Sequence, residues 1–387
     1  MIKSAAWYHY AIIRFFLGYA VSGIYASAYV LAIELVGGTK YRGTIAALYQ
    51  AGYGIGIPIC ALLSYQARNW RHLQLAIATT TLPLVIVAYF LPESPRQLLC
   101  AGKETEAEET LKMIASRNGH SSQNVSKIRL QSNTSYSEKE QEKAVNKKMS
   151  ILDLFRNGPE MTLVTLIAMF SFFTTCLCFT GLLLNSTELP VSPFLGASIN
   201  GFIDILANIV NAYVISSPKI GRKITLLVTE FGSGAVLLAS AYFYGQRICN
   251  DISDQNVFIS LILVFIGKFI NSMAYSTVYT YAIDLFPVPI RTTAVGLCTF
   301  TAQFGGSLSP VILVMKSYKE WLPSVVFGVG AILTGFIVLL LPETMAEKQF
   351  MNFDEATECF RRNFKKVGIN FTSEEKPSEK SLIESSA

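Results

Sequence analysis

Four tyrosines have a type and spacing that would suit the binding of an organic cation. Tyr25 and Tyr29 are four residues apart, as are Tyr275 and Tyr279, so each pair forms one stripe on a helix. The faces of aromatic rings attract organic cations, and the tyrosine hydroxyls are able to bond polar groups. Ordinary aromatic packing between helices is the alternative role for both pairs.

Asp204 is a carboxylate inside the apolar stretch 193–216. Placing such a group in hydrocarbon costs about 2.5–3.5 kcal/mol, so we expect it to face a cavity or a partner. Cation binding is one role, and a hydrogen bond to Asn208, one turn further on, is the structural alternative. Lys268 lies near the predicted outer end of its apolar stretch, where we expect it to reach toward the membrane surface.

The tyrosine pairs belong to an internal repeat with a period of 250 residues. The sequence LPES at 91–94 recurs as LPET at 341–344, and AIEL at 32–35 recurs as AIDL at 282–285. These matches lie in and beside long apolar stretches. Parallel repeats of membrane helices are the architecture of a large class of secondary transporters.

The elements that position these residues are predicted to be membrane helices. Hydrophobic residues make up 51% of the chain and charged residues 15%, whereas soluble domains carry about a quarter charged residues. A membrane-spanning helix needs about 20 apolar residues. The sequence therefore predicts an all-α membrane protein with about nine spans, at 10–33, 45–66, 72–91, 159–184, 193–216, 224–245, 257–282, 292–315 and 321–341.

Charge and polarity divide the chain into four parts. These are an incomplete N-terminal bundle (1–92), a polar linker (93–158), a six-helix bundle (159–342) and a tail (343–387). The linker and the tail hold 11 and 7 of the 32 basic residues, which favours a cytoplasmic position for both. Within the linker we expect a short surface helix over 104–118, because Glu108 and Lys112 have helical spacing.

The repeat also predicts a missing portion. The second copy holds six helices, and its period places the start of the first copy upstream of residue 1. We therefore expect the chain to correspond to helices four to twelve of a twelve-helix protein.

The motifs together resemble the organic cation, anion and carnitine transporter family, a solute carrier family 22-like group of the major facilitator superfamily. Residues 92–99 resemble its PESPRWLL signature, with Gln97 in place of Trp, and residues 279–287 resemble its YxYTxELYP motif. Residues 14–18 match RFxxG, and residues 221–223 match GR[RK], although Pro218 stands where that motif has Asp. The resemblance covers residues 10–345 and implies alternating-access transport of small organic ions across the plasma membrane.

The resemblance also implies roles for individual residues. Phe179 and Thr180 match positions where the family's cation carriers present an aromatic and a glutamine to substrate. Gln303 stands where those carriers have Asp and the anion and carnitine carriers have Arg, so neither sign of substrate gains a full counter-charge there. Packing against Gly305 and Gly306 is the alternative for Gln303. The family's acidic residue in helix eight lies close to Asp204.

A set of charged residues is predicted to gate the carrier, because inter-helix ion pairs at the inner face would hold the outward-open state. Arg14 joins this set because of its motif, and the remainder lie at the inner ends of helices. The set is Arg14, Glu34, Arg42, Glu93, Arg96, Arg222, Asp284, Arg291 and Glu343.

The sequence favours transport over catalysis. It has no Walker A loop, and its three histidines, His9, His72 and His120, are scattered. We therefore expect neither an enzyme nor a metal or cofactor site. The basic excess follows membrane topology and needs no nucleic-acid partner. The expected function is transport of small cationic or zwitterionic, carnitine-like ions. The alternative is a truncated, non-transporting partner or regulator of a full-length carrier, and the oligomeric state stays open.

Overall fold

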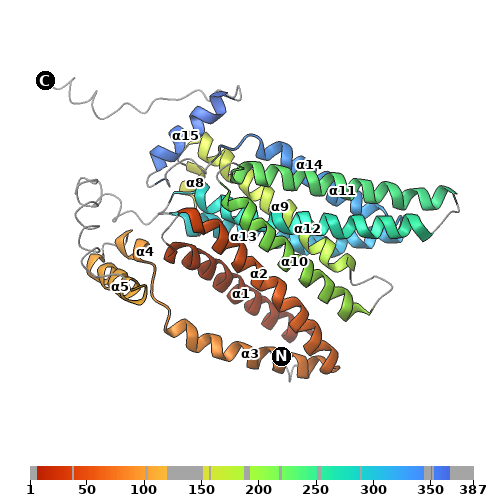
Figure 1. Ribbon diagram of the computed structural model, residues 1–387, viewed down its shortest axis with the longest axis horizontal. Helices are drawn as coiled ribbons and strands as arrows, with labels where there is room; N and C mark the ends of the chain where they lie inside the picture. Colours follow the sequence, from red (N-terminus) through yellow and green to blue (C-terminus); the bar gives the residue numbers. More distant parts are fainter. Residues whose placement is uncertain are drawn as a thin grey trace.

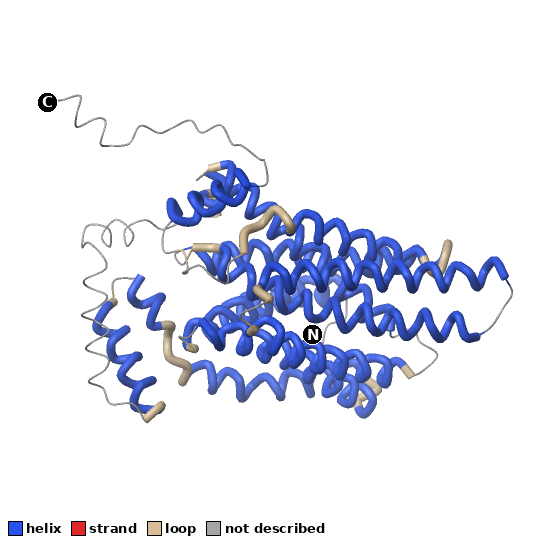
Figure 2. Tube along the Cα trace, turned by 45° about the horizontal axis from the view of Figure 1, so that its top comes forward, coloured by secondary structure: helices blue, strands red, loops and turns tan. Residues whose placement is uncertain are grey.

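The fold is a helical bundle with two sets of long helices side by side. The computed structural model describes residues 7–36, 39–100, 103–119, 151–156, 158–186, 192–217, 220–250, 254–287, 290–343, 350 and 353–366. All regular elements in these ranges are helices (Figure 2). The all-α prediction is therefore confirmed for the described part of the chain.

Eight of the described helices have the length and apolar composition to cross a membrane. They are α1 (Trp7–Leu35), α2 (Thr39–Gln66), α3 (Trp70–Tyr89), α9 (Pro159–Ser186), α10 (Pro193–Ser216), α11 (Arg222–Asn250), α12 (Asp254–Leu285) and α13 (Arg291–Val314).

The ninth predicted span, 321–341, contains a shorter apolar helix, α14 (Leu322–Val338). It is shorter than predicted because the α-helical hydrogen-bond pattern ends at Val338. The amides of Leu340 and Leu341 donate to the carbonyls of Ile337 and Val338, which are three residues back instead of four. The last residues before Pro342 therefore extend the chain as turns.

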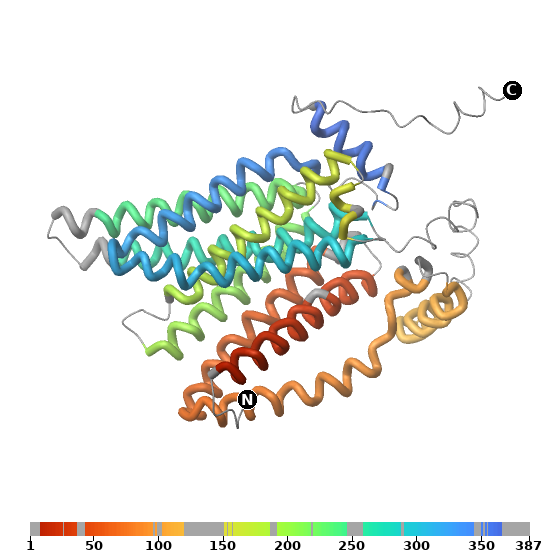
Figure 3. Tube along the Cα trace, turned by 180° about the vertical axis from the view of Figure 1, so that it is seen from behind, coloured from red at the N-terminus to blue at the C-terminus, as the bar shows by residue number. Residues whose placement is uncertain are grey.

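Helices α9 to α14 pack as one bundle, and α1 to α3 lie along one side of it (Figures 1 and 3). Helix α2 makes the main contact, against α10, and α3 is peripheral because none of its residues is buried. The linker helices α4 (Pro95–Cys100) and α5 (Glu104–Arg117) lie at the same end of the bundle as α8 (Asp153–Arg156) and α15 (Phe353–Lys366). The predicted surface helix over 104–118 is confirmed as α5.

Two glycines allow α2 and α10 to approach closely. A Cβ built on Gly201 would meet the carbonyl oxygen of Gly54 at 2.7 Å and would also run into the ring of Pro58. Small residues at such crossings let membrane helices pack backbone to backbone. The contact continues in one direction to Thr44 and Ser216, whose hydroxyl oxygens are 2.7 Å apart.

Helix α15 is an element that the sequence analysis does not predict. Its buried Ala356, Phe360 and Phe364 face the rest of the protein, and it packs on α9. The Arg361 Nε donates to the Glu160 Oε1 at 2.8 Å, where Glu160 is buried. The helix is amphipathic, and its apolar face packs on α9 and on neighbouring apolar residues such as Phe350.

Replacing Gly201 by valine tests the α2–α10 crossing. We expect Gly201→Val to lower the free energy of unfolding by about 1–3 kcal/mol, because the added atoms overpack the contact. The matched control is Gly52→Val on α2, where an added Cβ meets nothing within 4 Å. Thermal unfolding in detergent measures both variants, and equal losses would contradict the described crossing.

Candidate functional site

The two predicted tyrosine stripes meet where α1 contacts the second half of the protein. The ring centroids of Tyr25 and Tyr279 are 6.0 Å apart, and those of Tyr29 and Tyr279 are 5.6 Å apart. Four more rings from α2 and α9 join the four tyrosines of the stripes. This aromatic cluster consists of Tyr25, Tyr29, Tyr49, Tyr53, Phe172, Phe179, Tyr275 and Tyr279.

The hydroxyls of the aromatic cluster bond one another and nearby polar groups. Tyr25 donates to the Gln50 Oε1 at 2.5 Å, and Tyr49 donates to the Tyr25 carbonyl at 3.1 Å. The Tyr275 and Tyr279 hydroxyl oxygens are 3.3 Å apart. The Gln50 Nε2 is buried without a hydrogen-bond partner. The cluster is thus tightly packed and still holds polar groups that a ligand would satisfy.

An ion pair between α10 and α12 lies beside the aromatic cluster. The Lys268 Nζ is 3.2 Å from the Asp204 Oδ1, and the two side chains are 1% and 2% exposed. The same Nζ is 3.3 Å from the centroid of the Phe179 ring, which stacks on Tyr275 with a centroid separation of 4.6 Å. A cation over an aromatic face is a favourable contact when desolvated.

Two expectations for these charges are corrected. Lys268 does not reach the membrane surface, because Asp204 pairs with it inside the bundle. The Asp204 carboxylate also accepts a hydrogen bond from the Ser272 hydroxyl, whereas Asn208 donates to the Asp204 backbone carbonyl at 2.8 Å. The carboxylate therefore does not rely on Asn208, and its Oδ2 is buried without a hydrogen-bond partner.

A buried polar seam extends from this ion pair along α10 and α12. On α10, the fully or nearly buried Asn200, Asp204, Asn208 and Asn211 recur at helical spacing. The Thr277 hydroxyl on α12 donates to the Asn211 Oδ1 at 3.1 Å. Asn271 on α12 is fully buried, and neither of its side-chain polar atoms has a hydrogen-bond partner. Because buried polar groups are normally hydrogen-bonded, these amides are candidates to bind a polar ligand or water.

The structure places the remaining predicted binding residues in two different settings. Thr180 is half-buried on α9, with its Oγ1 3.8 Å from the Cys176 Sγ. A Cβ on Gly306 would meet that Oγ1 at 3.2 Å, so α13 approaches α9 here. Gln303 has an exposed side chain on α13. Its position is therefore on a face of α13 that the described part of the chain leaves uncovered.

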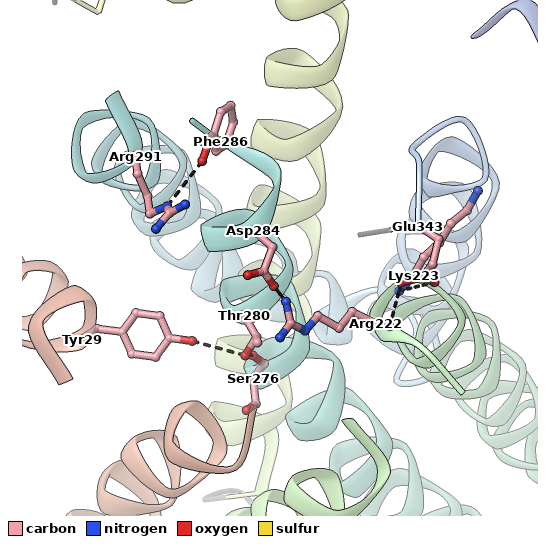
Figure 4. A network of polar contacts seen from close by, with 9 residues as sticks. All are labelled: Tyr29, Arg222, Lys223, Ser276, Thr280, Asp284, Phe286, Arg291 and Glu343. Atoms are coloured by element: carbon pink, nitrogen blue, oxygen red, sulfur yellow. Dashed lines mark hydrogen bonds and ion pairs between the residues drawn. The ribbon is translucent and has the colours of Figure 1, made fainter. Parts of the chain in front are cut away.

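Predicted gating residues from three elements meet at the end of the bundle where α11 begins and α12 ends (Figure 4). Arg222, at the start of α11, forms an ion pair with Asp284, near the end of α12. Both side chains are less than a tenth exposed. Glu343 follows α14 and accepts hydrogen bonds from the backbone amides of Arg222 and Lys223 at 3.1 and 3.2 Å. A carboxylate at the amino end of a helix is also favoured by the helix dipole.

A glycine allows Glu343 to sit this close to α11. Gly221 has a φ of +75°, and a Cβ on it would meet the Glu343 Oε2 at 2.7 Å. Glycine suits both the left-handed backbone and the close approach. The GR[RK] match at 221–223 and the LPET match at 341–344 therefore describe two sides of one contact.

Two further contacts join the motifs at this end. The Tyr281 hydroxyl donates to the Pro342 carbonyl, and the buried Arg291 donates from its Nε to the Phe286 carbonyl at 3.3 Å. The Tyr29 hydroxyl oxygen lies 3.4 Å from the Thr280 Oγ1, which ties the first half to this network (Figure 4).

Of the other predicted gating residues, Arg14, Glu34 and Glu93 have described side chains, and none of them makes a described contact with that network. Arg14 is exposed and donates from its Nε to the Tyr10 hydroxyl at 2.9 Å. Glu34 is half-buried and Glu93 is exposed. The side chains of Arg42 and Arg96 lie outside the described part of the structure.

Sequence reasoning missed several polar and aromatic residues of this region. Tyr49 and Tyr53 repeat the four-residue spacing of the other pairs, which is a signal that the sequence contains. Glu230 is an ionisable residue within an apolar stretch and is fully buried on α11, and Lys268 lies in a buried pair instead of at the membrane surface, where the sequence predicts it. The cost argument applied to Asp204 applies equally to these two.

Comparisons with known proteins agree with this architecture. A family profile described as sugar (and other) transporter matches residues 1–356. A Xenopus laevis protein named solute carrier family 22 member 15-like is 30% identical over 338 residues, which cover 87% of this chain and 65% of that protein. Mus musculus solute carrier family 22 member 2 is 29% identical over 92% of this chain and 61% of its own length.

A further relative and a solved structure are also similar to this chain. The Oryctolagus cuniculus organic anion transporter 3 is 30% identical over 87% of this chain and 59% of its own length. The major facilitator proton:xylose symporter XylE, bound to 6-bromo-6-deoxy-D-glucose, superposes with a TM-score of 0.63 at 17% identity, over 85% of this chain and 69% of that one. These matches confirm the predicted family resemblance and the major facilitator fold. The chain spans 65% or less of the length of these three curated relatives.

The Arg222–Asp284 pair is open to a direct stability test. We expect Asp284→Asn to lower the free energy of unfolding by about 3–5 kcal/mol, because it removes one charge of a buried pair. The control is Glu106→Gln, which breaks an exposed pair with Lys103 (3.0 Å) and should cost about 0.5 kcal/mol or less. Thermal unfolding of the purified protein compares them, and a small loss in both would show that the inner ion pair carries little energy.

Proposed function

Because this chain belongs to the sugar (and other) transporter family, we propose that it is a secondary carrier of small organic ions that works by alternating access. The observation that carries the proposal is the aromatic cluster, in which rings from α1 and α2 meet rings from α9 and α12 beside a buried ion pair. A ligand placed there would contact both halves of the protein, which is what alternating access requires of a binding site.

The charges beside the cluster support a zwitterionic substrate over a simple cation. Asp204 alone would favour a cation, but Lys268 neutralises it. A zwitterion is able to exchange partners with the pair, its ammonium taking the place of Lys268 at Asp204 and its carboxylate meeting the Lys268 Nζ. Aromatic faces such as those of Phe179 and Tyr275 suit a methylated ammonium. The substrate class that fits is therefore carnitine-like.

The inner network supplies the gate of this proposal. Arg222, Asp284 and Glu343 join the inner ends of α11, α12 and the segment after α14, and Tyr29 connects them to α1. Holding these contacts closes the inner end, and their release would open it. We place the carrier in the plasma membrane, with the linker and the tail on the cytoplasmic side, where their basic residues are favoured.

The ion pair is tested with the chain purified and reconstituted in lipid vesicles. Probes are L-carnitine, tetraethylammonium and benzoate, and the readouts are saturable binding and uptake. We expect the double variant Asp204→Asn/Lys268→Met to bind L-carnitine at least tenfold more weakly, since it removes both charges without leaving either alone. Lys319→Met is the control, because that lysine is exposed in the connection between α13 and α14.

The outcomes separate the alternatives. Unchanged carnitine binding in a folded double variant would remove the ion pair from the site. Saturable binding with no uptake would favour the alternative of a partner or regulator that binds without carrying. Preference of the parent protein for benzoate would overturn the zwitterion proposal.

Gln303 is proposed as a selector of substrate charge, and its exposed position on α13 leaves room for substitution. We expect Gln303→Asp to raise tetraethylammonium binding relative to benzoate, and Gln303→Arg to do the reverse, because the family resemblance implies opposite charges at this position in cation and anion carriers. The measurement is the ratio of the two dissociation constants. The same ratio in both folded variants and in the parent would place Gln303 outside the site.

A further inference from the structure

Glu230 is a buried carboxyl group that the proposed carrier site does not use. It lies on α11 and is fully buried. Its Oε1 is 2.7 Å from the Thr175 Oγ1 on α9, and its Oε2 is buried without a hydrogen-bond partner. Among the described residues, the Glu230 carboxyl group therefore has one hydrogen-bond partner, the Thr175 hydroxyl.

The geometry at Thr175 indicates which atom carries the hydrogen. The Thr175 Oγ1 lies 2.7 Å from the Glu230 Oε1 and also 2.7 Å from the Ser171 carbonyl oxygen. A hydroxyl has one hydrogen to donate, and a carbonyl oxygen only accepts. If Thr175 donates to Ser171, the short contact to Glu230 requires a hydrogen on the carboxyl. A protonated Glu230 therefore satisfies both contacts at once.

The helices packed against α11 supply no charge to balance an ionised Glu230 within the described residues. On α9, the neighbouring titratable group is the buried Cys178 thiol, while Glu160 pairs with Arg361. On α12, the described charged side chains Lys268 and Asp284 pair with Asp204 and Arg222.

Helix α14 has no charged residue, and it presents Ile332 and Gly328 to α11. On α10, which makes a smaller contact, Asp204 is the one charged residue. An isolated carboxylate in an apolar interior costs several kcal/mol even after relaxation, so the neutral form is favoured.

We infer that Glu230 is a proton-binding site, occupied in this conformation, and that its proton is exchanged when the contact between α9 and α11 changes. Thr175 lies one turn before Phe179 on α9, and Phe179 touches both Lys268 and Tyr275. The adjacent Thr174 hydroxyl oxygen is 2.5 Å from the Thr334 Oγ1 on α14. A shift of α9 on ligand binding therefore alters the one hydrogen bond of Glu230.

The proton on Glu230 is tested by infrared spectroscopy of the purified full chain in lipid, which needs no transport activity. Wild type at neutral pH is expected to show the carbonyl stretch of a protonated carboxylic acid, and Glu230→Gln is expected to lose that band. Glu160→Gln is the matched control, because Glu160 is also buried but ion-paired, and it should leave the band unchanged. The proton-binding site would be overturned if wild type lacked this band, or if the band remained in Glu230→Gln.

The link between the proton and substrate movement rests on the proposed function, and vesicle uptake tests it separately. With a saturable probe such as L-carnitine, a pH gradient should drive uptake in wild type at least tenfold better than in Glu230→Gln. Exchange at equal pH should survive in the variant. Equal response of both proteins to the gradient would overturn the coupling even if the infrared band is present. Absence of uptake for every probe would instead contradict the carrier function itself.

Discussion

A charge buried between apolar helices needs a partner, and this constraint organises the structure. Lys268 pairs with Asp204 between α10 and α12, Arg222 pairs with Asp284 between α11 and α12, and Arg361 pairs with Glu160 where α15 meets α9. Each pair joins two helices, so each fixes how those helices meet. Desolvating two charges costs free energy even when they pair, and apolar residues would pack the same helices without that cost. Buried ion pairs are therefore candidates for a functional role.

Helices α1 and α12 connect the aromatic cluster to the polar network of Arg222, Asp284 and Glu343. Tyr29 on α1 packs against Tyr279 and also approaches Thr280 on α12. Asp284 is one turn after Thr280 on that helix and belongs to the inner ion pair. Helix α12 therefore links the aromatic cluster directly to the Arg222–Asp284 ion pair. In the proposed carrier, the residues that contact substrate and the residues that close the inner end share one rigid element.

Much of the fold and part of the site were predictable from the sequence, because a repeat fixes symmetry. The spacing of Tyr25 and Tyr29 relative to Tyr275 and Tyr279 led to facing stripes, and the stripes meet. Periodicity shows which face of a helix is polar but not what lies opposite. The pairing of Lys268 with Asp204 and the isolation of Glu230 depend on which helices are neighbours. The same limit applies to the apolar face of α15, because the sequence does not show that Phe360 and Phe364 pack against α9 and neighbouring apolar residues such as Phe350.

The central claim is that the Lys268–Asp204 pair and the aromatic cluster form one site for a zwitterion. An experimental structure of the chain with L-carnitine bound tests it most directly. We expect the carboxylate of carnitine within hydrogen-bond distance of the Lys268 Nζ, and its trimethylammonium group against rings of the aromatic cluster, next to Asp204. Carnitine bound elsewhere, with the pair between Lys268 and Asp204 intact, would contradict it.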